Sequence, residues 1–286
     1  GGPMSNGEIK STWAAVLDHT RHFSDFTFVY PVISRRSKGL SIGVNLNPDK
    51  VCNFDCIYCE VDRRIPGAVA EVDLRQMKDE LTAMVRFAKD GGLAKETKFD
   101  EVPWLTRAVK DIAFSGDGEP TMIQNFAECV ETVVEVQQLE GLDETKIVLI
   151  TDAAGLDKAE GKRGLETMDA HNGEIWGKLD AGTEEYYRQV NRSNVKFERI
   201  LNNLLETSRK RPIIIQSLFL KVHGEAMSDG ELEAYCGRLR DLTAAGGQIS
   251  EVHLYTVARP TPEAFATKLE VPELEAMAAT VRERTD

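Results

Sequence analysis

From residue 40 onward, short apolar runs alternate with longer stretches in which apolar side chains recur every three or four positions. The short runs predict β-strands. The longer pattern predicts amphipathic helices, as in 71–90, where Met77, Leu81 and Met84 fall on one helical face. Predicted strands cover 41–46, 110–115, 146–151, 174–179, 213–220 and 251–257, and predicted helices cover 71–90, 123–139, 160–169, 183–190, 195–208, 228–245 and 272–284.

Strands that alternate with helices form a parallel sheet covered by helices, so this order predicts an α/β fold. Six strand-and-helix units after residue 40 indicate a partial, TIM-like (β/α)6 barrel over 40–286, with a C-terminal helix. We expect an N-terminal extension over 1–39, with a helix near 8–21 and then an extended stretch. Residues 1–3 have the character of a tag-cleavage scar before Met4.

Three of the five cysteines, Cys52, Cys56 and Cys59, fall within eight residues in the spacing C-x3-C-x2-C, directly after the first predicted strand. Three thiolates can hold three irons of a four-iron, four-sulfur cube and leave the fourth iron open to a ligand. The alternatives are a zinc site and three unrelated thiols. A zinc site needs a fourth ligand, and Cys129 and Cys236 are distant and single.

A glycine-rich segment, Ser-Gly-Asp-Gly-Glu-Pro-Thr over 115–121, follows the second predicted strand. Taken alone, it is typical of a tight turn that needs positive φ angles. It also lies one strand-and-helix unit after the cysteines. The carboxyl ends of barrel strands meet at one face, so we expect the two loops to lie there together.

The two motifs together resemble the signature of the radical S-adenosylmethionine (SAM) superfamily. The phrases 47–59, 114–121 and 178–187 are similar to those of its tRNA wyosine-synthase branch, and the likeness extends over about 40–257. The resemblance implies a radical SAM partial barrel, a [4Fe-4S] cluster on Cys52, Cys56 and Cys59, and oxygen-sensitive chemistry. The open iron would chelate SAM, and one electron would split SAM into methionine and a 5′-deoxyadenosyl radical that abstracts hydrogen from a substrate.

Further cofactor contacts are implied by the same resemblance. Gly118, Glu119 and Pro120 would hold the amino group of SAM, although Asp117 replaces the first glycine of the family's pair. Glu119 can accept a charge-assisted hydrogen bond from an ammonium.

An aromatic at Tyr58 would pack near adenine, and Lys178 and Asp180 would meet the methionine carboxylate and ribose. The alternatives are loop packing for Tyr58 and a mutual ion pair for Lys178 and Asp180. Gln216 is a lone polar residue in an apolar strand, which a core hydrogen bond or a ribose contact would explain.

The candidates for substrate contact and catalysis lie near the carboxyl ends of predicted strands or just after them. They are Asn45 and Asn47, Thr151 and Asp152, His253 and Tyr255, and Arg259. A lone histidine on a strand is more often a satisfied core group than a proton donor. Cys129 and Cys236 lie in helical patterns and are interpreted as small buried hydrophobes.

The net charge of −12 disfavours nucleic acid as a partner, because phosphate backbones attract clustered positive charge. Residues 1–51 also lack the cysteines with which the wyosine enzymes bind a second cluster. We therefore expect a small-molecule or small flexible substrate and an external, flavodoxin-like or ferredoxin-like electron donor. The cysteine usage favours a cytoplasmic location, and no apolar run approaches the ~20 residues of a membrane span.

Three other functions fit the same motifs less well. A tRNA base-modifying enzyme would share the motifs but bind an anionic partner. A glycyl-radical-enzyme activase would form a stable complex with a large protein. An iron–sulfur redox sensor or electron carrier would have no need of the segment Gly118-Glu119-Pro120 or of an open iron.

Overall fold

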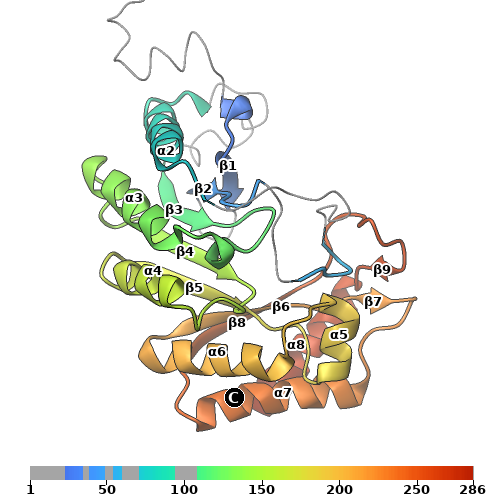
Figure 1. The fold of residues 1–286 in the computed structure, drawn as a ribbon. Helices are drawn as coiled ribbons and strands as arrows, with labels where there is room; N and C mark the ends of the chain where they lie inside the picture. The colour runs from blue at the N-terminus through green and yellow to red at the C-terminus, as the bar shows by residue number, and fades with distance from the viewer. Residues whose placement is uncertain (1–22, 35–38, 49–53, 60–70, 94–107, 286) are drawn as a thin grey trace, which may run out of the picture. The chain divides into compact units, whose positions relative to one another are not determined.

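The computed structural model describes residues 23–34, 39–48, 54–59, 71–93 and 108–285 (Figure 1). Cys52, the predicted helix near 8–21 and residues 94–107 lie outside the described residues. The hydrogen-bonded strand order is β1-β2-β3-β4-β5-β6-β8, and β1 is antiparallel to β2. The predicted α/β partial barrel is confirmed.

The six predicted barrel strands are all present, and each ends within two residues of its predicted boundary. The strands of the described residues are β1 (Val29–Ser34), β2 (Gly39–Val44), β3 (Val109–Phe114), β4 (Lys146–Thr151), β5 (Gly173–Lys178), β6 (Ile213–Leu218), β7 (Lys221–Val222), β8 (Ile249–Tyr255) and β9 (Ala266–Thr267). The six predicted strands correspond to β2, β3, β4, β5, β6 and β8. The α-helices are α2 (Leu74–Lys89), α3 (Phe126–Leu139), α4 (Ala159–Asp169), α5 (Glu184–Asn191), α6 (Phe197–Lys210), α7 (Asp229–Ala244) and α8 (Val271–Thr285), with 3-10 turns η1 (Phe23–Asp25) and η5 (Pro120–Met122).

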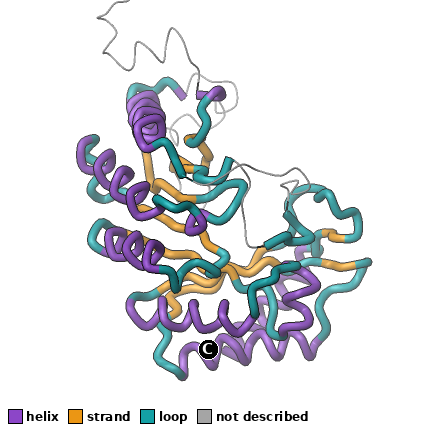
Figure 2. The backbone as a smooth tube through the Cα atoms, in the orientation of Figure 1, coloured by secondary structure: helices purple, strands orange, loops and turns teal. Residues whose placement is uncertain are grey.

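Two compact units make up the chain: residues 1–49, 68–149 and 159–174 in the first, and 50–67, 150–158 and 175–286 in the second. In the first unit, α2, α3 and α4 line one side of the strands (Figure 2). Alternate strand residues such as Ile42 and Phe114 are fully buried, and the Phe114 ring meets Phe126 of α3 edge-on at 5.9 Å. Ala113, which precedes Phe114, is buried as well, so β3 is covered on both faces, as strands of a parallel sheet usually are.

One buried carboxylate fixes α2 to the start of β1. Glu80 has no exposed surface and accepts hydrogen bonds from the backbone N–H groups of Thr27, Phe28 and Val29 at 3.0, 2.8 and 3.3 Å. Such bonds make a buried charge tolerable. The β1 strand was expected only as an extended stretch, and its antiparallel pairing with β2 is a finding of the structure.

In the second unit, strands β5, β6 and β8 turn one face towards α6 and α7. Ile213 and Ile215 of β6 are buried on that face, and Ser217 bonds the hydroxyl of Tyr235 in α7 at 2.6 Å. The opposite face carries Lys178, Gln216 and other polar residues. A short antiparallel ribbon, β7 with β9, completes this unit and was not predicted.

No helix among the described residues is long and apolar enough to cross a membrane. The division into an extension over 1–39 and a barrel over 40–286 remains a prediction.

Candidate functional site

The described part of the cysteine loop, residues 54–59, pairs with the C-terminal turn of α5. The backbone N–H of Asp55 donates to the carbonyl of Asn191, and that of Ile57 donates to Val190, both at 2.9 Å. Cys59 then closes a turn by donating its N–H to the carbonyl of Cys56 at 3.0 Å. Cys56, between the two paired residues, is thus held by backbone hydrogen bonds on both sides.

Arg192 ends α5 and clamps the same loop. Its backbone is left-handed, with φ of 46°. Its guanidinium donates to the carbonyl oxygen of Asp55 at 2.7 Å and forms ion pairs with the carboxylates of Asp55 at 3.4 Å and Glu263 at 3.1 Å. The helix end and its flanking cation therefore fix the position of the loop.

Cys56 is buried, and Asn191 Nδ2 lies 3.1 Å from its Sγ. Burial raises the pKa of the Cys56 thiol to about 12, so without a nearby metal the thiol stays protonated. Cys59 is half-buried and Cys52 lies outside the described residues. Within the described ranges, no three His, Cys, Asp or Glu side chains are grouped as metal ligands. Thiols on one short loop have the donor chemistry that iron–sulfur clusters take, so the residues fit such a group.

A polar network surrounds Cys56. The Lys178 ammonium lies 2.8 Å from the hydroxyl of Tyr58, 3.5 Å from that of Tyr255 and 3.8 Å from Asp180 Oδ2. The hydroxyl of Tyr58 also donates to Asp180 Oδ2. Burial opposes the charge on Lys178, but Asp180, Tyr255 and Cys56 together outweigh it and hold the pKa of Lys178 above its usual range.

Asp180 is the centre of this network. It is 2% exposed, and its Oδ1 accepts the backbone N–H of Leu218 in β6 at 2.9 Å while Oδ2 accepts from Asn191 Nδ2 at 3.0 Å. The ion pair between Lys178 and Asp180, which sequence analysis gave as the alternative to cofactor contact, is present. Cofactor contact by either residue remains a proposal.

The remaining candidates of the polar face lie in one row across the sheet. Gln216 is the register partner of Lys178 on one side and of His253 on the other. The His253 ring meets Trp176 edge-on at 5.1 Å, and its Nε2 lies 2.5 Å from Glu251 Oε1. His253 therefore has hydrogen-bond and ring partners, as is common for a lone histidine on a strand, and its catalytic role remains a prediction.

In the first unit, two asparagines after β2 hold the glycine-rich loop 115–121. Asn45 donates to Asp117 at 2.8 Å, and Asn47, 1% exposed, donates to the carbonyl of Glu119 at 3.1 Å. Gly116 has φ of 151°, and a Cβ there would lie 2.6 Å from the Asn45 side chain. The asparagines predicted to face substrate thus shape this loop, and substrate contact by them remains a prediction.

Glu119 is 2% exposed and caps the short turn η5, since its Oε2 accepts the backbone N–H of Thr121 at 3.2 Å and also the Thr121 hydroxyl. Pro120 is buried beside it, and Gly118 precedes it. The carboxylate is therefore held in a fixed orientation by its own loop.

Asp152 bonds its own loop, and Cys129 and Cys236 lie at buried positions of helices. Asp152 is 4% exposed and its Oδ1 accepts the backbone N–H of Ala154 at 2.8 Å, while Thr151 bonds Ala153 in the same manner. Cys129 and Cys236 are both fully buried in helices, which confirms the prediction that they are small buried hydrophobes.

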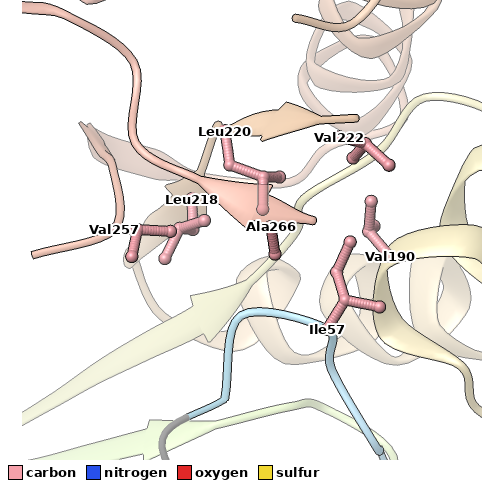
Figure 3. Close-up of a cluster of buried hydrophobic side chains, with 7 residues drawn as sticks. All are labelled: Ile57, Val190, Leu218, Leu220, Val222, Val257 and Ala266. Atoms are coloured by element: carbon pink, nitrogen blue, oxygen red, sulfur yellow. The ribbon is translucent and has the colours of Figure 1, made fainter. Parts of the chain in front are cut away.

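A cavity of about 670 Å³ lies in the second unit, lined by Arg259, Lys221 and the segment before β9. It shares Val257 and Ala266 with a cluster of buried apolar side chains that also contains Ile57 of the cysteine loop (Figure 3). The other members of that cluster are Val190, Leu218, Leu220 and Val222. The cavity is thus linked to the cysteine loop through one group of packed residues.

Sequence reasoning missed Asn191 and Arg192. In the sequence they are only two polar residues directly after a predicted amphipathic helix, and polar residues are common at helix ends. Tyr30 was also missed; its ring lies over Gly43 in the neighbouring strand, where a Cβ would come within 2.1 Å of the ring, and its hydroxyl donates to the carbonyl of Ser115 at 3.0 Å.

No family model matches the chain. It is 28% identical over 176 residues to a UPF0026 protein of Methanocaldococcus jannaschii and 24% identical over 233 residues to one of Helicobacter pylori. These matches cover 62% and 81% of the chain but 46% and 66% of the relatives' own lengths.

A third match, 25% identical over 181 residues, is to the GTPase Obg of Brachyspira hyodysenteriae. It covers 63% of this chain but 23% of that protein. The present sequence contains no G-x-x-x-x-G-K-[ST] phosphate-binding loop, so the match gives no reason to infer GTP binding.

Two solved structures share the fold. TYW1 with a bound lysine–pyruvate adduct aligns with a TM-score of 0.53 at 17% identity and covers 96% of this chain and 82% of its own. SuiB of Streptococcus suis aligns with a TM-score of 0.56 at 13% identity over 87% of this chain and 48% of its own, and SuiB has also been solved with S-adenosylmethionine bound. Both proteins are radical SAM enzymes, and TYW1 is the wyosine synthase. The predicted resemblance is therefore confirmed at the level of the fold: the chain has the partial-barrel fold of the radical SAM enzymes TYW1 and SuiB.

Proposed function

We propose that this chain is a radical SAM enzyme. It would hold a [4Fe-4S] cluster through Cys52, Cys56 and Cys59 and bind SAM at the open iron. When bound, the cluster supplies the electron that cleaves SAM reductively to a 5′-deoxyadenosyl radical. The observation that carries the proposal is the buried network of Lys178, Asp180 and Tyr58 directly beside Cys56. Unrelated thiols on this loop would not require the Lys178 ammonium beside Cys56.

The chain's own residues have distinct proposed tasks. The Lys178 side chain is 17% exposed and its ammonium is oriented by Tyr58 and Asp180, so it suits a carboxylate such as that of the methionine part of SAM. Asp180 fixes both Lys178 and the Tyr58 hydroxyl, and the ring of Tyr58 offers an aromatic face to adenine. Gln216, beside Lys178 in the sheet, is placed to meet the ribose.

Glu119, with Gly118 and Pro120, is proposed to bind the ammonium of SAM. Its carboxylate already accepts two hydrogen bonds from Thr121, which keep it oriented. Electrons would come from an external flavodoxin-like or ferredoxin-like donor, and the protein would be oxygen-sensitive and cytoplasmic.

The substrate is proposed to be a small molecule or a small flexible chain. The −12 net charge disfavours a polyanion, and the cavity beside Val257 and Arg259 has the size that small ligands occupy. A tRNA substrate is the second candidate, favoured by the likeness in fold to TYW1. His253, Tyr255 and Asp152 remain the candidates for a catalytic role.

Product analysis tests the enzyme class. Chemically reduced, reconstituted protein is expected to convert SAM slowly to 5′-deoxyadenosine and methionine even without substrate. Glu119→Ala should weaken SAM binding by about 1.5–3 kcal/mol, the value of a charge-assisted hydrogen bond, while the iron content stays the same. Unchanged SAM affinity in that variant would remove Glu119 from the site.

Binding of total tRNA at two salt concentrations decides between the substrates. Weak binding that collapses as salt rises is expected for an acidic protein. Tight binding that persists near ~0.15 M salt, where exposed charges more than ~8 Å apart are screened, would favour the tRNA reading.

A further inference from the structure

Asn191 is the last residue of α5 and is 1% exposed. Its side-chain amide nitrogen lies 3.1 Å from Cys56 Sγ, 3.0 Å from Asp180 Oδ2 and 3.4 Å from the Tyr58 hydroxyl. An amide nitrogen carries two hydrogens. The two shortest contacts use both, one on the sulfur and one on the carboxylate.

The backbone of Asn191 is fixed independently of its side chain. Its carbonyl accepts the N–H of Asp55 at 2.9 Å, and the neighbouring Val190 carbonyl accepts that of Ile57. The cysteine loop would therefore stay docked on α5 if the side chain were changed. The Asn191 amide joins the sulfur of Cys56 to the carboxylate of Asp180, and the Tyr58 hydroxyl is a second hydrogen-bond partner of that sulfur.

Hydrogen bonds to cysteine sulfur withdraw electron density from the sulfur and are one of the factors that set the reduction potential of an iron–sulfur cluster. We propose that Asn191 is a positioning residue that stabilises the reduced cluster through Cys56 Sγ and ties that sulfur to Asp180. The inference rests on the proposed function, because it assumes that Cys56 is a cluster ligand.

The alternative is that the amide only fills space at the end of α5. Several residue types could fill that space, but the two hydrogen bonds require a donor. The alternative therefore predicts that a non-donor of similar size leaves the reduction potential unchanged. The proposal predicts a shift.

The test compares Asn191→Leu and Asn191→Asp with Asn203→Leu. Asn203 is a matched control, because it is also a buried asparagine of the second unit, 3% exposed, whose amide donates to the Ala153 carbonyl at 2.9 Å. After anaerobic reconstitution, the midpoint potential of the cluster and the iron content are measured. Both Asn191 variants are expected to shift the potential to a more negative value, with the larger shift in the Asp variant, which adds a charge. Asn203→Leu should match the unmutated protein. Full iron content with an unchanged potential in both Asn191 variants would overturn the proposal.

A second measurement covers the case in which the variants do not hold a cluster. The unmutated protein is labelled with ¹⁵N at asparagine side chains, reduced, and examined by pulsed electron paramagnetic resonance. A ¹⁵N coupling to the cluster is expected in the unmutated protein, and its absence there would overturn the inference. If the proposed function itself fails, the unmutated protein gives no cluster signal at all, so the two failures are distinguishable.

Discussion

Replacing Asp180 by asparagine tests the energetics of the buried network most sharply. The substitution keeps size and shape but removes the negative charge. Its oxygen can still accept the Leu218 N–H, which now bonds Oδ1 at 2.9 Å. The new amide group then takes the place of Oδ2, opposite the Asn191 amide that now donates across 3.0 Å. Two donors would face each other, and Lys178 would lose its counter-charge.

The cost follows from burial. The side chains of Lys178 and Asp180 are 17% and 1% exposed, so neither charge is well hydrated. Removing one partner of a buried ion pair leaves the other uncompensated, which costs about 3–5 kcal/mol. We therefore expect Asp180→Asn to destabilise the metal-free protein by about that amount. Adding Lys178→Met should recover most of the loss, because a buried pair replaced by neutral groups is often close to neutral.

Asp157→Asn is the matched control. Asp157 also bonds a single cation in the second unit, Arg199 at 3.0 Å, but their side chains are 40% and 46% exposed. Such a surface pair contributes about 0–1 kcal/mol. Urea denaturation of both variants, followed by circular dichroism, gives the comparison. A loss in Asp180→Asn no larger than that in Asp157→Asn, or no recovery with Lys178→Met, would refute the reasoning.

Three further predictions concern pH, packing and the buried acid of α2. Burial opposes the charge on Asp157, but the Arg199 guanidinium, together with hydrogen bonds from the backbone and Asn203, outweighs it and lowers the pKa of Asp157 below 3.8. The small contribution of this carboxylate is therefore present above that pH and lost as pH falls through the lowered pKa, which denaturation of Asp157→Asn at pH 7 and pH 3 checks. Gly43→Ala should destabilise the protein by about 1–3 kcal/mol, because the new Cβ displaces the Tyr30 ring. Gly237→Ala, whose Cβ would have nothing closer than 3.6 Å, should be neutral or stabilising, and thermal melting of both variants makes the comparison. Glu80→Ala leaves backbone donors without their acceptor and should cost at least about 3 kcal/mol; a melting temperature equal to that of the unmutated protein would contradict this.

Local patterns predicted most of the fold. The predicted strand 146–151 coincides with β4, because its consecutive apolar residues Ile147, Val148 and Leu149 are all buried, as in a strand covered on both faces. The ribbon of β7 and β9 was missed, since two-residue strands have no period and their pairing joins Lys221 to Thr267 across the sequence. The antiparallel partner of β2 was missed for a similar reason: pairing depends on what lies beside a strand.

The residues of the candidate site likewise divide into those that a local pattern predicted and those that it did not. Lys178 and Asp180 were predicted to lie on one side of their strand, and the structure places both beside Tyr58. Asn191 could not be predicted, because its contact with Cys56 bridges 135 residues and depends on how the end of α5 docks on the loop. Residues that act through another residue leave little trace in a local pattern.

The central claim is that Cys56 is a ligand of a cluster whose open iron binds SAM. Anaerobic reconstitution of the unmutated chain, Cys56→Ala and the control Cys129→Ala, followed by iron and sulfide counting and by electron paramagnetic resonance with and without SAM, tests it most directly. We expect about four irons per chain in the unmutated protein and in Cys129→Ala. We also expect loss of the cluster in Cys56→Ala and a changed spectrum when SAM is added. Four irons retained in Cys56→Ala, zinc in place of iron, or a spectrum that SAM leaves unaltered would contradict the account.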